Sequence, residues 1–426
     1  HCFAHPHKST CENDPGLTAR YDRTFLALHN DVQPKEVEEA LPHLLEYFAK
    51  TPEIHTIWGA TEAPWDSDKT LTTKLTDVAL GFMEDHLEEH PDKPFFLHWG
   101  PPDPHEYYQA PRDVAERFPI EDIKLPPSLG CDLSDRAQFV QYMHWYFNHG
   151  ERPPSEADYK QLLRIYLAMC QHVDDQLGRI LDFVQERGLW ENTIFVFSSD
   201  HGDMAGEMAL AHKWNGLYDG MIRVPLAIAA PGNPDLLAGQ RCDAPVNLVD
   251  LAATLCEFAG TEAPKGNQGA SLVPLMDGTG SREYAFLESG LAGRGMTMGD
   301  VKNFPDHDWS RPTSDCAPYD PPHRWTGRCL GVRDKRYKLI TREGQSDELY
   351  DLISDPWETR NLIGESELKE TVLRLKQALF EHTATLQSNN LKAWGDKHMD
   401  PNYTPGQSEV WHRPIHKPWQ PANNVS

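Results

Sequence analysis

The sequence predicts an α/β fold: a large, mostly parallel sheet with helices on both faces, followed by a small C-terminal antiparallel sheet with one helix. Two observations predict it. Up to about residue 280, amphipathic helical patterns alternate with short apolar runs, which is typical of helices that cover a buried parallel sheet. Beyond that point, short strands separated by polar turns follow one another, and one amphipathic stretch closes the pattern.

The first part begins with an amphipathic pattern over 71–90, which predicts a helix, and the apolar run 95–99 predicts a buried strand. Residues 111–154 are irregular and rich in proline, so we interpret them as a surface insertion. Apolar residues recur every three or four positions over 159–187 and Gly188 follows, which predicts the clearest helix of the chain.

Buried strands are then predicted over 193–199 and 224–230, and a helix over 249–258. The later short strands and the closing helix are predicted at 284–287, 331–333, 337–340, 348–352 and 367–386, the last with Ser366 as its N-cap. This divides the chain into an α/β domain (1–280), a small subdomain (281–390) and an extended tail (391–426).

Composition excludes several classes of protein. The formal net charge is −25 over 426 residues, which argues against a nucleic-acid partner because phosphate backbones need Lys and Arg. No apolar run reaches the roughly 20 residues of a membrane span. The eight cysteines form no CxxC pair, so a zinc knuckle is not expected, while one or two disulfides stay open.

Chemistry-bearing residues gather where predicted strands end. Asp200 and His201 follow the strand 193–199, and Lys213 lies in the loop that continues from them. Asp103-Pro104-His105 follows the strand 95–99. Ligands of open α/β sheets lie beyond the carboxyl ends of the strands. Carboxylate and imidazole can hold a divalent cation, and a lysine there can stabilise an anionic oxygen. Together these residues suit attack on a tetrahedral anionic ester.

Plainer interpretations stay open beside this one. Asp-His-Gly is commonly a turn, and His212 is interpreted as an exposed histidine. The aromatic residues Tyr142, Trp145 and Tyr146 either form a wall that binds a sugar or an aryl group, or simply pack.

Five ordered segments resemble the sulfatase family of the alkaline-phosphatase superfamily, from about residue 71 to 363. They are "DKPFFLHWGPPDPHEYYQAP", "MCQHVDDQLGRILDFVQERGLWENTIFVFSSDHGDMAGE", "KWNGLYDGMIRVPLAIAAPG", "NLVDLAATLCEFAG" with "GASLVPLMDG", and "GVRDKRYKLI" with "ELYDLISDPWETRNL". The resemblance implies an alkaline-phosphatase-like fold. It implies that Asp200 and His201 bind a divalent metal, expected to be Ca²⁺ with Mn²⁺ or Zn²⁺ as alternatives. It also implies that His105 and Lys213 contact the sulfate.

The sequence departs from the family at its nucleophile. Sulfatases carry an N-terminal aspartate pair, then Cys-x-Pro/Ala-x-Arg, whose Cys or Ser becomes formylglycine, and later Gly-Lys-x-His; these motifs are absent here. We interpret Cys316-Ala317-Pro318 and the run from Cys329 to Arg333 as coincidences. The expectation is that the chain lacks about 100 N-terminal family residues and is inactive alone.

The resemblance implies a metal-dependent hydrolase of sulfate esters, with a small-molecule or glycan sulfate ester as its substrate. A phosphonate monoester or phosphodiester hydrolase of the same superfamily is the alternative, because that branch also uses Asp-His at this loop. A non-catalytic binding protein derived from a sulfatase is the alternative from another class. The sequons at Asn402 and Asn424 do not decide between periplasm, cell exterior, lysosome and cytoplasm, and the oligomeric state is open.

Overall fold

The computed structural model describes residues 60–63, 65–106, 108–148, 153–290, 297, 299 and 327–398, with the side chains of the last helix described to residue 386. Cys316 and both sequons lie outside the described residues. The helices are α4 Leu71–Glu89, α5 Arg112–Ala115, α6 Gln138–Asn148, α7 Glu156–Glu186, α8 Asp219–Ile222, α9 Asp250–Phe258, α10 Val273–Met276 and α12 Lys369–His398. The strands are β1 Thr61–Glu62, β2 Gln109–Ala110, β3 Phe195–Ser198, β4 Leu226–Ala229, β5 Ala285–Ser289, β6 Cys329–Arg333, β7 Tyr337–Arg342 and β8 Glu348–Asp351.

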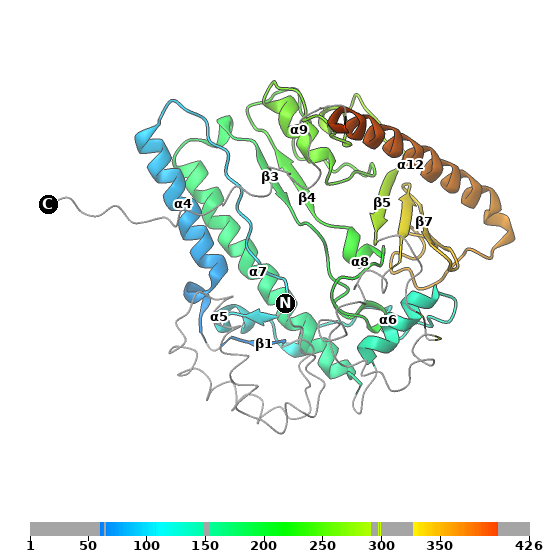
Figure 1. Cartoon of the computed structure of the whole chain (residues 1–426). Helices are drawn as coiled ribbons and strands as arrows, with labels where there is room; N and C mark the ends of the chain where they lie inside the picture. The colour runs from blue at the N-terminus through cyan, green and yellow to red at the C-terminus, as the bar shows by residue number, and fades with distance from the viewer. Residues whose placement is uncertain are drawn as a thin grey trace.

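The predicted long helices are confirmed. The helix α7 begins with a capping box, in which the side chain of Ser155 accepts from the backbone of Asp158 and the Asp158 side chain accepts in return. The helix α4 begins at Thr70, whose side chain accepts from the backbone N–H of Thr73. The two helices lie side by side (Figure 1), and Met83 of α4 packs against Ile180 and Val184 of α7.

The large parallel sheet is not formed among the described residues, so this part of the fold prediction stays a prediction. Only β1 and β2 pair in parallel, whereas β3 and β4 pair antiparallel, Phe195 opposite Ala229. Parallel neighbours need a crossover, usually a helix, that returns the chain to the same end of the sheet. The connection from β3 to β4 is a loop with a short 3-10 helix (Glu207–Ala209) and the short helix α8, and it brings the chain back in the opposite direction.

The prediction of a buried strand at 95–99 is wrong. These residues have no regular secondary structure, and the side chain of Phe96 is 80% exposed. A strand is held by hydrogen bonds to a neighbouring strand. Among the described residues no strand pairs with 95–99, so apolar composition alone does not make it one.

The segment 111–154 is not a surface insertion, because the unpredicted helix α6 forms inside it. Phe139, Val140, Tyr142 and Phe147 of α6 are buried. Val140 and Phe147 belong to the main core, together with residues of α7 and of the loop after β3. The segment therefore contributes to the main core.

The C-terminal prediction is confirmed. Strands β5, β6, β7 and β8 form one antiparallel sheet in that order, and α12 packs across it (Figure 1). Leu375 and Leu379 of α12 join a second core with residues of the sheet. Ser366 begins a 3-10 turn ahead of α12 rather than capping it, and α12 continues to His398, past residue 391. The domain boundary near residue 280 stays a prediction.

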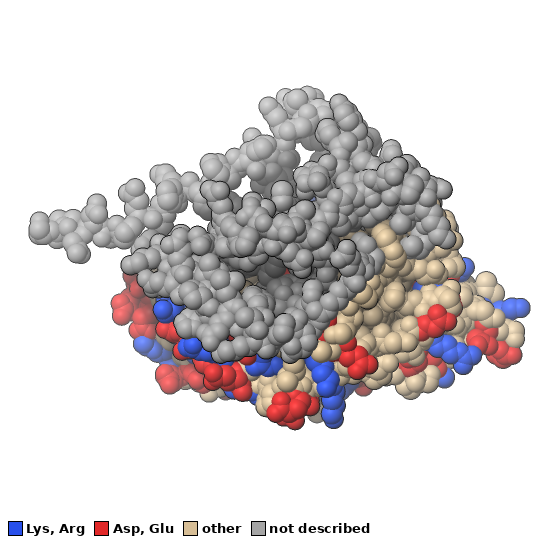
Figure 2. All heavy atoms as spheres, turned by 90° about the horizontal axis from the view of Figure 1, so that it is seen from below, with Lys and Arg blue, Asp and Glu red and all other residues tan. Residues whose placement is uncertain are grey.

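Two surface properties bear on partners. No helix in the described part of the chain is long and apolar enough to cross a membrane. Figure 2 shows acidic and basic side chains intermixed on the described part of one face.

Candidate active site

The loop that follows β3 carries the two predicted metal ligands. Because a carbonyl oxygen only accepts, the Nδ1–H of His201 donates to the backbone oxygen of Gly202, at 2.9 Å. This leaves Nε2 of His201 as the free ring nitrogen, 3.7 Å from Oδ2 of Asp200. Histidines that bind metals commonly donate their other N–H to a backbone carbonyl. The side chain of Asp200 is 88% exposed, so the pair fits a divalent cation that approaches from the surface.

His105 and Lys213 meet at the same place. Nδ1 of His105 donates to the backbone oxygen of Glu106 at 2.6 Å, and Nε2 contacts the ammonium group of Lys213. An ammonium group has no acceptor, so Nε2 of His105 is the acceptor in this contact. The rings of His105 and His201 are 6.1 Å apart. The structure thus brings His105, Lys213 and His201 together, with Asp200 beside His201.

Two residues that sequence reasoning missed complete this cluster. Glu106 is 7% exposed, and its carboxylate accepts from the Nζ of Lys213 at 2.7 and 2.8 Å. Nδ1 of His212 lies 3.0 Å from the same carboxylate. His212 was predicted to be exposed, but it is 5% exposed because Phe147 stacks on its ring at 6.0 Å. The sequence marks these two residues only by their position, because Glu106 follows the predicted His105 and His212 precedes the predicted Lys213.

A second set of ligand atoms lies close by. Glu106, Asp203 and His212 each place one potential ligand atom within 4.8 Å of the others. Asp203 also accepts from the hydroxyl of Tyr108 at 2.6 Å, and the ring of Tyr108 lies 5.7 Å from that of His212. This triad is the second place at which the described residues could hold a metal ion, although the ammonium of Lys213 already occupies the carboxylate of Glu106.

The loop that carries Lys213 is folded tightly. His212 has a φ of 61° and Met208 a φ of 55°, in the left-handed region that side chains rarely adopt. The backbone N–H of Met204 donates to the oxygen of His212 at 3.1 Å, which holds this shape. Met204, Met208 and Leu210 are buried. The loop is therefore a packed element with Lys213 at its surface, where 29% of the lysine side chain is exposed.

The C-terminal sheet holds this loop in place. The hydroxyl of Tyr218 donates to the buried carboxylate of Glu348 at 2.6 Å, and Arg342 donates to the backbone oxygen of Asn215 at 2.6 Å. The ammonium of Lys338, itself fully buried, reaches Asp219 of α8 at 2.8 Å.

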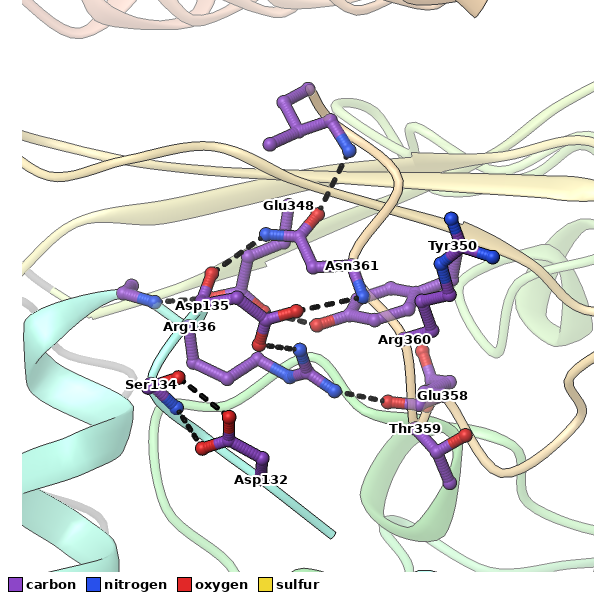
Figure 3. Close-up of polar contacts among 12 residues, drawn as sticks. Asp132, Ser134, Asp135, Arg136, Glu348, Tyr350, Glu358, Thr359, Arg360 and Asn361 are labelled. Carbon is purple, nitrogen blue, oxygen red and sulfur yellow. Dashed lines mark hydrogen bonds and ion pairs between the residues drawn. The ribbon is translucent and has the colours of Figure 1, made fainter. Parts of the chain in front are cut away.

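A further set of contacts ties the segment before α6 to the same subdomain (Figure 3). The guanidinium of Arg136 donates to the backbone oxygen of Glu358 at 2.8 Å and lies over the ring of Tyr350 at 5.3 Å. Asn361 donates to the backbone oxygen of Asp135 at 2.9 Å. The site loop, the core helix α6 and the C-terminal sheet thus form one connected unit.

The aromatic residues of α6 pack rather than form a wall. Tyr142 is 4% exposed and its ring stacks near Phe139 at 6.3 Å. The rings of Trp145 and Tyr146 lie 6.0 and 6.2 Å from the ring of Tyr142. These contacts favour the packing interpretation that the sequence left open.

A large cavity opens beside the candidate site. Its volume is about 2520 Å³, and residues of α4, α7, β3 and the segment 91–106 line it, with His105, Asp200 and His201 on its wall. Ligand pockets usually enclose about 300–1,000 Å³, so this space is too large to define a substrate by its shape. Burial raises the pKa of Asp103 on the same wall to about 6, although a hydrogen bond from Thr72 lowers it.

Comparison with known proteins identifies the family. Residues 7–261 match the family described as Sulfatase, which is more than half of the chain, and residues 308–385 match N-sulphoglucosamine sulphohydrolase, C-terminal. The chain belongs to the sulfatase family.

Several curated relatives are similar. A sulfatase of Formosa agariphila is 28% identical over 77% of this chain and 58% of that protein. An arylsulfatase of Clostridium perfringens is 27% identical over 75% of this chain and 59% of that protein. The multifunctional alkaline phosphatase superfamily protein PehA of Trinickia caryophylli is 27% identical over 73% and 59%. The chain thus spans about three fifths of the length of these relatives.

Solved structures support the alkaline-phosphatase-like fold. The phosphonate monoester hydrolase of Silicibacter pomeroyi has a TM-score of 0.63 at 23% identity, over 77% of this chain and 62% of that one. A protein solved with its substrate D-glucosamine-2-N,6-O-disulfate has a TM-score of 0.56 at 23% identity, over 75% and 70%. The predicted superfamily is confirmed by the family match.

Proposed function

We propose that the protein hydrolyses sulfate esters with the help of a divalent metal ion. The observation that carries the proposal is that His105, Lys213 and His201, from two separate segments, converge at one place with Asp200 beside them. The similarity to proteins named sulfatase and arylsulfatase supports the choice of ester. The chain spans about three fifths of the length of these relatives. The activity is therefore proposed for the whole protein.

Each residue has a role in the proposal. Asp200 and His201 would hold the metal, which polarises a sulfate oxygen when bound. Calcium takes 6–8 oxygen ligands, so this pair supplies part of its shell, and the imidazole of His201 also suits Mn²⁺ or Zn²⁺. The ammonium of Lys213 would neutralise charge on the sulfate. His105, whose Nε2 contacts the ammonium of Lys213, would contact the sulfate and assist the leaving oxygen of the ester.

A phosphonate monoester hydrolase is the second candidate. His201 favours it, because the phosphonate branch of the superfamily shares the Asp-His pair, and the similarity to the multifunctional protein PehA is consistent with it. A non-catalytic binding protein is the third, and turnover of any ester would exclude it.

The test compares turnover of 4-nitrophenyl sulfate and of 4-nitrophenyl phenylphosphonate by the whole protein, purified, with Ca²⁺, Mn²⁺ or Zn²⁺ added. The proposal expects a higher kcat/KM for the sulfate ester. A higher value for the phosphonate would assign the second function, and no turnover of either, with sulfate binding retained, would assign the third. That the 426 residues are inactive alone stays a prediction, which the same assay checks.

A further inference from the structure

Glu106 is the charged centre of the candidate site. Its carboxylate oxygens accept from Lys213 at 2.7 and 2.8 Å and lie 3.0 Å from Nδ1 of His212 and 3.2 Å from Nδ1 of His105. It is 7% exposed. One buried carboxylate therefore contacts three basic side chains that come from two separate segments of the chain.

We propose that Glu106 is a positioning residue whose buried carboxylate fixes the ammonium group of Lys213, and with it the ring of His105, at the mouth of the candidate site. A lysine side chain has four rotatable bonds and loses much entropy when it is held in one place. Two charge-assisted hydrogen bonds from one ammonium group to one carboxylate supply that restraint. The functional half of this inference rests on the proposed hydrolysis of sulfate esters.

The charge state of Glu106 is consistent with this role. Burial alone would raise the pKa of its carboxyl group, but hydrogen bonds and charges from His212 and Lys213 outweigh burial and lower the pKa to about 2. The carboxylate is therefore ionised wherever the protein is folded near neutral pH. It also repels an anionic ester directly, so Glu106 acts on the substrate through Lys213 and not by contact.

A metal ion shared by Glu106, Asp203 and His212 is the competing explanation. The ammonium of Lys213 already lies 2.7 Å from the carboxylate of Glu106, and a divalent cation bound to the same group would repel it. The hydroxyl of Tyr108 also occupies one oxygen of Asp203 at 2.6 Å. These contacts favour positioning over ligation.

The test is Glu106→Gln in the whole protein, with Glu106→Asp as the conservative variant. The amide of the glutamine variant turns an N–H₂ donor toward the ammonium, which displaces Lys213. We expect kcat/KM for 4-nitrophenyl sulfate to fall about 100-fold, the order that a misplacement of about 1 Å costs, and Glu106→Asp to restore most of it. Glu62→Gln is the matched control, because Glu62 lies away from these residues and pairs with Arg164, with 2.6 Å between the two charged groups. This variant should leave kcat/KM unchanged.

A double-mutant cycle decides how Glu106 acts. If it acts through Lys213, adding Glu106→Gln to Lys213→Ala lowers kcat/KM no further. Additive losses would overturn the proposal, and so would equal loss of bound metal, by mass spectrometry, in the variants Glu106→Gln, Asp203→Asn and His212→Gln.

A readout without activity separates this inference from the proposed function. A crystal structure of the Glu106→Gln protein should show the Nζ of Lys213 moved away from its position in the wild type. An unmoved lysine refutes the positioning role even if the protein hydrolyses sulfate esters. A moved lysine upholds the restraint even if the wild type hydrolyses none.

Discussion

Lys338 offers the sharpest test of how the C-terminal sheet supports the candidate site. Its ammonium group is fully buried and contacts Asp219 at 2.8 Å and Glu358 at 2.5 Å. Asp219 also pairs with Arg333 at 2.8 Å. Glu207 adds a third carboxylate, because burial and then the charges of Glu358 and Asp219 raise its pKa to about 7. Lys338 is thus one of two cations that balance three acids.

The perturbation is Lys338→Met, which keeps the length of the side chain and removes its charge. Removing one partner of a buried ion pair costs about 3–5 kcal/mol, because the remaining charge is left uncompensated. We expect the free energy of unfolding to fall by about 4 kcal/mol at pH 8. The loss should shrink at pH 5, because burial also raises the pKa of Glu358 and protonation of the glutamates then removes the uncompensated charge.

Urea denaturation at both pH values measures this. Lys376→Met is the matched control, since Lys376 is 48% exposed and pairs with Asp347 at 2.6 Å; exposed pairs contribute about 0–1 kcal/mol. Adding Glu358→Gln to Lys338→Met should recover part of the loss. A loss below about 1 kcal/mol at pH 8, or one that is the same at pH 5, would refute the account of this network.

Two other predictions concern charge and metal. In the wild type, the pKa of Glu207 is raised from 4.5 to about 7 in the folded state, so the free energy of unfolding falls as pH rises through that window. Glu207→Gln should remove this fall, so the variant should lose less stability between pH 5 and pH 8 than the wild type does. The difference should be on the order of 1–3 kcal/mol at about 1.4 kcal/mol per unit, and equal pH profiles of variant and wild type in urea melts would contradict it. Asp200→Asn should lower bound metal and ester turnover at least 10-fold while the melting temperature stays within a few degrees, because Asp200 is 88% exposed; unchanged metal content by mass spectrometry would remove Asp200 from the site.

Elements with a clear local pattern, such as α7 and the C-terminal strands, were predictable, whereas the helix α6 and the conformation of the run 95–99 were not. The helix α7 has both a regular apolar period and a capping box. The helix α6 is rich in aromatic residues and lies among prolines, so its period was hidden. The run 95–99 has the composition of a strand but no described strand pairs with it. Pairing and burial are tertiary properties that a local pattern cannot supply.

The candidate site divides in the same way. His105, Lys213, Asp200 and His201 were predicted from their places after predicted strands and from the family resemblance, and the structure brings His105, Lys213 and His201 into one cluster. Glu106 was missed because nothing local marks a glutamate that will be buried. His212 was taken as exposed because its burial depends on Phe147, a residue 65 positions earlier that reaches it only through the fold.

The measurement that tests the central claim most directly is turnover of 4-nitrophenyl sulfate by the Lys213→Ala variant of the whole protein, read beside its melting temperature. Loss of one well-placed donor to a developing anion costs about 3–4 kcal/mol, or roughly 10²–10³ in kcat. Lys213 is 29% exposed, but its removal leaves the buried carboxylate of Glu106 with His212 and His105 as its remaining basic partners, so the melting temperature should fall as well. The account predicts a loss of turnover of that order in protein that is still folded at the assay temperature; near-normal turnover with a lowered melting temperature would assign Lys213 to the fold and contradict the proposed site.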